Sequence, residues 1–187
     1  MNKLLSYLIL VLTLMACKSD SKKSTRVDEL PYYTEATFKA KWFEKGELIP
    51  ENFHQIPSFS LINQSGDTIT EKDVEGKIYV TDFFFTSCPG ICPRMTNNMA
   101  IIQQEFMGNE KVLLLSHSVT PEYDSVSVLK NYAQTKGVIS GKWHLLTGSR
   151  DQIYNLGRNS YFVEEDLGLA KDTGDFIHTE NFVLIDG

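Results

Sequence analysis

The sequence I-Y-V-T-D-F-F-F-T-S-C-P-G-I-C-P at residues 78–93 places two cysteines between a strand and a helix. Its first eight residues are almost all β-branched or aromatic, a pattern typical of a strand buried on both faces. After the cysteines, Pro93 suits the first turn of a helix. Apolar residues then recur at helical spacing until Gly108, at Met95, Met99, Ile102 and Phe106. The stretch therefore predicts a strand, a loop and a helix in that order.

The flanking segments extend this unit into an α/β chain. A second apolar run at 112–115 makes residues 78–115 a predicted βαβ unit, right-handed by the usual rule. Upstream, residues 59–70 indicate a hairpin with a glycine-containing turn. Downstream we expect a helix that starts at Asp124 or Ser125 and stops at Gly137, a strand at 143–146, a helix from Ser149 to Gly157 and a strand at 182–185. The predicted class is α/β, with a central mixed β-sheet flanked by helices and an N-terminal β-hairpin extension.

Composition excludes several classes of protein. The chain has 187 residues, of which 42% are hydrophobic and 22% charged, as is ordinary for one globular domain. Its net charge is −6 and its pI about 5.2, so there is no basic field to bind nucleic acid. The sequence contains no phosphate-binding loop or dinucleotide fingerprint, so we expect no nucleotide ligand.

The N-terminus has the features of an export signal. Lys3 precedes an apolar run at 4–15, and Leu14-Met15-Ala16-Cys17 resembles the lipobox of bacterial lipoproteins. This resemblance implies that residues 1–16 are a signal peptide and that Cys17 is lipidated. We therefore expect an exported protein that is lipid-anchored to a bacterial membrane, with its domain on the periplasmic side. The alternative is a cysteine that follows a signal peptide by chance.

Between the anchor and the domain, residues 17–45 are expected to form a tether and an edge segment. Residues 18–30 are polar and charged, which is typical of a flexible linker. Residues 31–43 are rich in aromatic side chains and are expected to form an edge strand or hairpin that packs on the main body. The domain itself is expected to cover residues 46–187.

The residues that point to a chemical function are Cys88 and Cys92. If Cys17 is lipidated, the three cysteines leave one pair, Cys88 and Cys92. A helix N-terminus favours thiolate over thiol, because its dipole and free N–H groups stabilise the negative charge. Two thiolates there can form a disulfide, donate electrons or bind a soft metal.

The motif T-S-C-P-G-I-C-P-R-M at residues 86–95 resembles the Sco/SenC family of copper proteins of cytochrome c oxidase assembly, and the likeness extends over about residues 52–187. This resemblance implies a thioredoxin-like fold and a copper site made by Cys88, Cys92 and His178. Two thiolates and an imidazole suit a single Cu(I) ion. The partner implied is the apo form of the copper subunit of cytochrome c oxidase, or another copper or thiol protein.

The chain departs from the family pattern at several points. Many relatives have Asp where this chain has Gly90, and the stretch D-P-E-x-D begins here with Thr120. Neither change removes an expected ligand. Relatives continue with a further strand and a final helix, so we expect this sequence to lack both.

Two other readings of the thiol pair remain open. Asp82 lies six residues before Cys88 in an apolar strand, where thioredoxin has a buried aspartate, so it is a candidate proton acceptor for a thiol–disulfide oxidoreductase. Asp82 could instead point to a polar pocket or to water. The pair could also be a fixed structural disulfide. We favour a metallochaperone over an enzyme, and we assign Met95 and Met99 to the core. His54, His117 and His144 belong to no motif, and of these His144 is expected to be structural.

Overall fold

The computed structural model describes residues 30–44, 46–50, 52–164 and 176–186. The chain divides into two units, Met1–Pro31 and Tyr32–Gly187, and the fold belongs to the second. The predicted signal peptide, the lipidation site Cys17 and tether residues 18–29 lie outside the described residues. Within the described part of the chain, no helix has the length and apolar character needed to cross a membrane.

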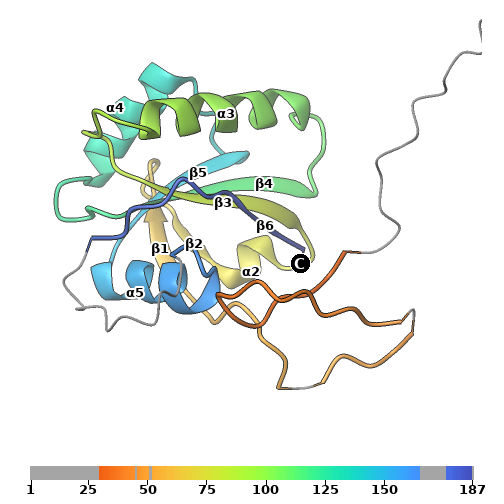
Figure 1. Cartoon of the computed structure of the whole chain (residues 1–187). Helices are drawn as coiled ribbons and strands as arrows, with labels where there is room; N and C mark the ends of the chain where they lie inside the picture. Colours follow the sequence, from red (N-terminus) through yellow and green to blue (C-terminus); the bar gives the residue numbers. More distant parts are fainter. Residues whose placement is uncertain (1–29, 45, 51, 165–175, 187) are drawn as a thin grey trace, which may run out of the picture. The chain divides into compact units, whose positions relative to one another are not determined.

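The second unit is built on a six-stranded sheet with the order β2-β1-β5-β4-β3-β6 (Figure 1). The strands are β1 (Ser60–Asn63), β2 (Thr68–Thr70), β3 (Ile78–Phe84), β4 (Val112–Ser118), β5 (Trp143–Thr147) and β6 (Val183–Ile185). The central strands β3, β4 and β5 run parallel, whereas β2, β1 and β6 pair antiparallel with their neighbours. The predicted mixed sheet and the predicted N-terminal hairpin are both confirmed.

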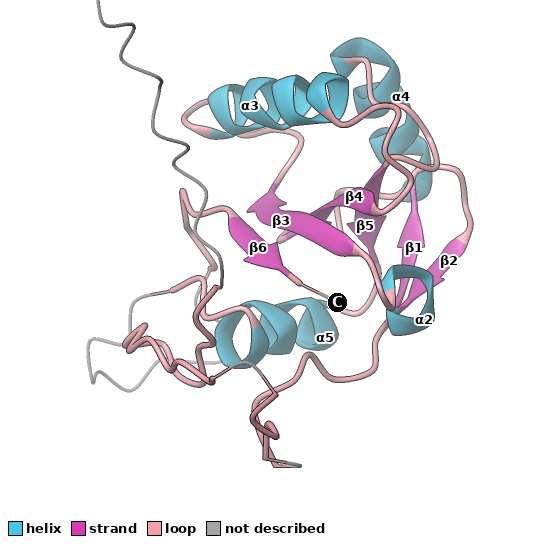
Figure 2. Ribbon diagram, turned by 90° about the vertical axis from the view of Figure 1, so that its right-hand side faces the viewer, coloured by secondary structure: helices cyan, strands magenta, loops and turns pink. Residues whose placement is uncertain are grey.

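Helices cover both faces of the sheet (Figure 2). Helices α3 (Cys92–Glu105) and α4 (Val126–Lys136) lie on one face, and α5 (Arg150–Asn155) lies on the other. The short α2 (Glu71–Val74) follows β2. Side-chain alternation along β3 separates two cores: Phe84 packs with Cys92 and Met99 of α3, and Phe83 packs on the α5 side. Met99 is fully buried, which confirms its assignment to the core.

Helix α4 begins and ends where the sequence predicts. The Ser125 hydroxyl accepts a hydrogen bond from the Val128 N–H at 3.5 Å, and Gly137 ends the helix with a left-handed φ of 70°. Helix α5 is capped by Ser149, as predicted. The chain then continues through a π-helical turn at Leu156–Ser160, so the helical segment does not stop at Gly157. Packing explains why a glycine stands at this position: a Cβ at Gly157 would lie 3.0 Å from Ile177 Cδ1, so the glycine allows close approach and is not a helix stop.

The predicted edge strand or hairpin at 31–43 is reduced to a single bridge. Tyr32 and Lys41 exchange backbone hydrogen bonds of 2.8 and 2.9 Å. Ring contacts hold this segment to the next one, since Phe43 and Phe53 lie 5.3 Å apart between ring centres. Aromatic packing, as expected, fixes this segment, but it adds no strand to the sheet.

Candidate thiol site

The two cysteines lie where β3 gives way to α3. Strand β3 ends at Phe84, and α3 begins at Cys92 with Pro93 in its first turn. Cys88 is half-buried in the connecting loop, Cys92 is only 5% exposed, and both are free thiols. The pair therefore lies at the carboxyl edge of the parallel strands, with one sulfur accessible and one enclosed.

Hydrogen bonds favour the thiolate form of Cys88. Burial alone would raise the pKa of this thiol, but hydrogen bonds from the Cys92 thiol and from the backbone N–H groups of Cys92, Gly90 and Ile91 outweigh burial and lower it. These donors come from the turn that opens α3, as the sequence predicts for a helix N-terminus. Cys88 is the member of the pair that ionises first.

Cys92 keeps its proton. Burial raises the pKa of this thiol to about 12, and its hydrogen bond to Cys88 and the charges of Cys88 and Asp82 add to the rise. A thiol that donates to a neighbouring thiolate shares the negative charge between the two sulfurs. The accessible Cys88 is thus the more readily ionised thiol, and Cys92 must lose a proton before it can act as a thiolate.

Asp82 is a buried carboxyl group on the face of β3 that α3 covers, close enough to Cys92 to affect its pKa. It shares a face of β3 with Phe84, on the side of the sheet covered by α3, and it is 1% exposed. The Ser116 hydroxyl donates to its carboxylate, and the Trp143 indole N–H donates to that hydroxyl at 2.9 Å. Burial raises the pKa of Asp82 to about 7, although the Ser116 hydrogen bond opposes the rise. Its partner is Ser116 and not solvent, so it can hold or release a proton near neutral pH.

His178 lies in a segment that meets the start of the cysteine loop. The pairing of β6 with β3 ends at Val183 and Thr81. Before β6, the ring of Phe176, two residues from His178, lies 5.3 Å from the ring of Phe85, which directly follows β3. This contact brings the segment that carries His178 near the cysteine loop.

The imidazole itself is exposed. Among the described residues, no three His, Cys, Asp or Glu side chains are gathered as a metal site would need. The structure brings Cys88 and Cys92 together and brings the segment of His178 near the cysteine loop, but it does not assemble the three as a ligand set.

Asp124 is a residue of this edge that the sequence analysis missed. It is 1% exposed, and both of its carboxylate oxygens accept hydrogen bonds from Thr86 in the cysteine loop, at 2.5 Å from the hydroxyl and 3.2 Å from the N–H. Ser118 and Thr120 also donate to it, at 2.6 and 3.1 Å. The available signal was an Asp surrounded by hydroxyl residues, in a loop that follows a strand parallel to β3.

The remaining histidines have structural surroundings. His54 lies 2.9 Å from the Ser160 carbonyl, and His144 lies 3.2 Å from the Asn63 amide. His117 is buried on the α5 side of the sheet, where its Nδ1 lies 2.9 Å from the Thr81 hydroxyl. None of these three is part of the thiol edge.

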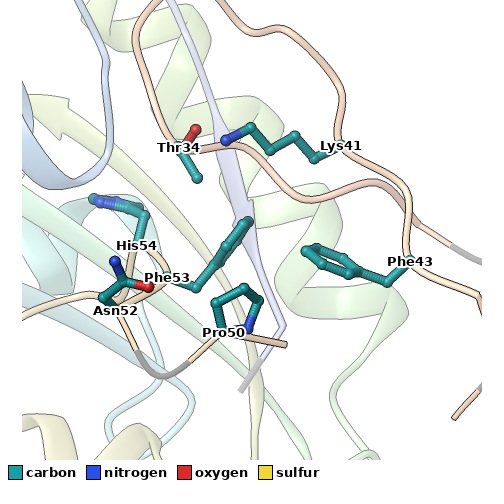
Figure 3. Close-up of a pocket in the computed structure, with 7 residues that line it drawn as sticks. All are labelled: Thr34, Lys41, Phe43, Pro50, Asn52, Phe53 and His54. Carbon is teal, nitrogen blue, oxygen red and sulfur yellow. The ribbon is translucent and has the colours of Figure 1, made fainter. Parts of the chain in front are cut away.

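A pocket lies near the start of the second unit, away from the cysteines in sequence (Figure 3). Its aromatic side includes Phe53, whose ring centre lies 5.7 Å from Lys41 Nζ. The residues that line it are Thr34, Lys41, Phe43, Pro50, Asn52, Phe53 and His54. None of the predicted site residues lines this pocket, so the pocket is not part of the candidate thiol site.

Comparison with known proteins shows the family to which this chain is related. A family model described as SCO1/SenC matches residues 49–187. The chain is 30% identical to the Bacillus subtilis SCO1 protein homolog over 134 residues, which cover 71% of this chain and 68% of that protein. It is 32% identical to the SCO2-like protein RT0576 of Rickettsia typhi across 57% of this chain, and it spans about half (51%) of that relative's length.

Solved structures are similar over the same region. A SCO1/SenC family lipoprotein from Bacillus anthracis has a TM-score of 0.60 and 33% identity, covering 71% of this chain and 78% of that one. BsSco, described as a cytochrome c oxidase assembly protein with a disulfide switch, has a TM-score of 0.58 and 29% identity, with coverages of 71% and 77%. Copper-bound ScoI from Bradyrhizobium japonicum has a TM-score of 0.56 and 29% identity, with coverages of 70% and 83%. These neighbours confirm the predicted thioredoxin-like fold.

Proposed function

Because the chain belongs to the SCO1/SenC family, we propose that it is a copper metallochaperone for the assembly of the dinuclear copper site of cytochrome c oxidase. The ion is its cargo, and Cys88, Cys92 and His178 are the proposed ligands. The observation that carries this proposal is the thiol pair itself: one accessible sulfur with a lowered pKa beside an enclosed sulfur. A copper-bound relative with 29% identity supports the choice of metal.

The donor chemistry fits one Cu(I) ion. Thiolates are soft ligands that select Cu(I), and an imidazole completes a three-coordinate set. Capture starts on the Cys88 thiolate, and binding releases the Cys92 proton because both thiols must be deprotonated to ligate. His178 is exposed in a segment near the cysteine loop, so it closes on the metal last. Delivery is then an exchange of these ligands for those of a docked apo-partner, the copper subunit of the oxidase.

The first experiment is the ratio of copper to protein in the reduced full chain, purified in detergent with a thiol competitor to remove loose metal. We expect about one Cu(I) per chain, as the single three-ligand set implies. Copper should be lost in Cys88→Ser and Cys92→Ser and reduced in His178→Ala. The controls are Ser87→Ala beside the motif and His54→Asn away from it. A folded chain that retains no copper while its thiols still react sinks the metallochaperone proposal.

For localisation, we propose export and lipidation of Cys17, with the domain on the periplasmic side of a bacterial membrane. The similar Bacillus anthracis protein is described as a lipoprotein, which supports this proposal. Cys17→Ser should move the chain from the membrane fraction to the soluble fraction. Persistence in the membrane fraction contradicts the proposal.

A second candidate function is thiol–disulfide exchange, and Asp82 is the observation that favours it. The Cys88 thiolate attacks a partner disulfide, forms a mixed disulfide and releases one partner thiolate. Cys92 gives its proton to Asp82, whose pKa of about 7 suits the transfer, and attacks the Cys88 sulfur. A Cys88–Cys92 disulfide forms, and the partner leaves as a dithiol with the two electrons. Single-turnover reduction of a small aromatic disulfide by the reduced chain tests this function, and Cys92→Ser should stop at the mixed disulfide.

A further inference from the structure

The Asp124 carboxylate joins the cysteine loop to the neighbouring loop of the sheet edge. Oδ1 accepts the Thr86 hydroxyl hydrogen bond, and Oδ2 accepts the Thr86 N–H together with the hydroxyls of Ser118 and Thr120. Hydrogen bonds to a carboxylate are about twice as strong as those between neutral groups. Two of the four bonds go to one residue of the cysteine loop, so the carboxylate fixes both the backbone and the side chain of Thr86.

Asp124 is itself held firmly. Its N–H and that of Tyr123 both donate to the Thr120 carbonyl at 2.9 Å, closing a turn after β4. The next residue, Ser125, begins α4. The carboxylate therefore projects from a rigid junction between a fully buried strand and a helix, which makes it a fixed point for the loop opposite.

Thr86 controls the course of the loop that carries Cys88. It is the second residue after β3, and the Cys88 N–H donates to the Phe85 carbonyl at 3.3 Å to close the turn around it. The N–H groups that bond the Cys88 sulfur belong to Gly90, Ile91 and Cys92, on the far side of the same loop. The loop that carries the sulfur is thus fixed at both ends, by α3 at one end and by the Thr86–Asp124 hydrogen bonds at the other.

We propose that Asp124 is a positioning residue for the thiol pair, which it holds in the reactive arrangement through its two hydrogen bonds to Thr86. The metal-binding side of this inference rests on the proposed function, whereas the positioning of Cys88 does not. When the Thr86 contact is lost, the cysteine loop samples other conformations, and the two sulfurs spend less time in contact with each other. A Cys88–Cys92 disulfide is then formed less readily.

The test is the equilibrium of the metal-free full chain with a glutathione redox buffer, in which oxidised glutathione takes up two electrons and leaves as two glutathione thiols when the Cys88–Cys92 disulfide forms. Peptide mass spectrometry after alkylation counts this disulfide and separates the pair from Cys17. Thr86→Val removes the hydroxyl donor and keeps the shape. It should lower the equilibrium constant for forming the disulfide about threefold to tenfold, the scale of one hydrogen bond. Thr86→Ser keeps the donor and should behave as wild type.

Thr120→Val is the matched control, because it removes a hydroxyl from the same carboxylate without touching the cysteine loop. It should leave the equilibrium constant for the disulfide unchanged. Combining Thr86→Val with Asp124→Asn, in variants whose folding is checked by circular dichroism, should lower this constant no more than Asp124→Asn alone if Asp124 acts through Thr86. A wild-type constant in Thr86→Val, or an equal decrease in Thr120→Val, overturns the proposal. Since no metal is present, failure of copper binding leaves this result standing.

Discussion

Asp82 lies on the face of β3 that packs beneath Cys92, so a buried carboxyl and a buried thiol share one side of the sheet. Burial raises the pKa of both groups, and the negative charge of Asp82 raises that of Cys92 further. The two acids are therefore linked: ionisation of one makes ionisation of the other harder.

This linkage predicts that Asp82→Asn spares copper binding but slows disulfide exchange. Without the carboxylate charge, Cys92 ionises more easily, so copper capture should persist. Disulfide exchange should slow, because Cys92 has lost its proton acceptor, by about tenfold or more in the resolving step near neutral pH. Copper content and stopped-flow resolution of a mixed disulfide measure the two effects, with the exposed Asp151→Asn as control. Equal loss of both functions contradicts the linkage.

The pH dependence of stability should contain two opposing contributions from buried groups. Burial raises the pKa of Asp82 from 3.8 to about 7, so its contribution is fully present below about pH 4 and is lost as the pH rises to about 7. Burial lowers the pKa of His117 from 6.5 to about 4, so its contribution is present above about pH 6.5 and is lost as the pH falls to about 4. Between about pH 4 and 6.5, the two contributions to the free energy of unfolding therefore nearly cancel.

Removing the Asp82 contribution should leave the pH dependence that comes from His117. In Asp82→Asn, the free energy of unfolding should rise from pH 4 to 6.5 more steeply than in wild type, by on the order of 3 kcal/mol. His144 adds to this rise, because burial also lowers its pKa. Urea unfolding at a series of pH values measures the slope. Parallel profiles for wild type and Asp82→Asn would show that Asp82 ionises as freely in the native state as in the unfolded one.

A carboxylate at position 90 should make Cys88 a weaker acid. A Cβ built on Gly90 lies 4.0 Å from Cys88 Sγ, an ordinary contact distance. In Gly90→Asp the added charge disfavours the nearby thiolate, so alkylation of Cys88 at neutral pH should slow about threefold to tenfold. Gly90→Asn has nearly the same shape without the charge and should react almost as wild type. Identical rates for the two variants would assign the effect to shape.

Crowding Gly157 should disturb the segment that carries His178. A Cβ there would lie 3.0 Å from both Ile177 Cδ1 and Phe83 Cε1, so Gly157→Ala should lower the free energy of unfolding by about 1–3 kcal/mol. Ile177 precedes His178 directly, and copper retention should therefore fall as well. The control is Gly108→Ala, where nothing lies within 4 Å of the added carbon. A stable Gly157→Ala variant with full copper would separate this packing contact from the metal site.

Local patterns were sufficient to predict most of the fold. The apolar run of β3, the helical spacing of Met95 and Met99 and the cap at Ser125 each involve residues close in sequence, and each is confirmed. The predictions failed where distant packing decides the outcome. Gly157 lies inside a helical turn where Phe83 and Ile177 leave no room for a Cβ, and neither approach is visible in the local sequence.

The same distinction applies to the site. The thiol pair was predictable because its two residues share one loop. The position of Asp124 depends on two loops that meet only after β3 and β4 pair, and it accepts hydroxyl hydrogen bonds from both, from Thr86 in one loop and Thr120 in the other. The exposure of His178 depends on how the segment before β6 is packed, and a sequence motif carries no information on that packing.

Strand β6 has a consequence for the kinetics of the site. Only three of its residues pair with β3, and Leu184 is 57% exposed, whereas all seven residues of β4 are buried. Opening free energies follow such differences in protection, so β6 can detach while β3, β4 and the thiol loop remain intact. Amide hydrogens of β6 will therefore exchange with solvent far sooner than those of β4. The segment at 176–186, which carries His178, then behaves as a separate cooperative unit. In the proposed metallochaperone, the opening of this segment would therefore limit how long the copper ion stays bound.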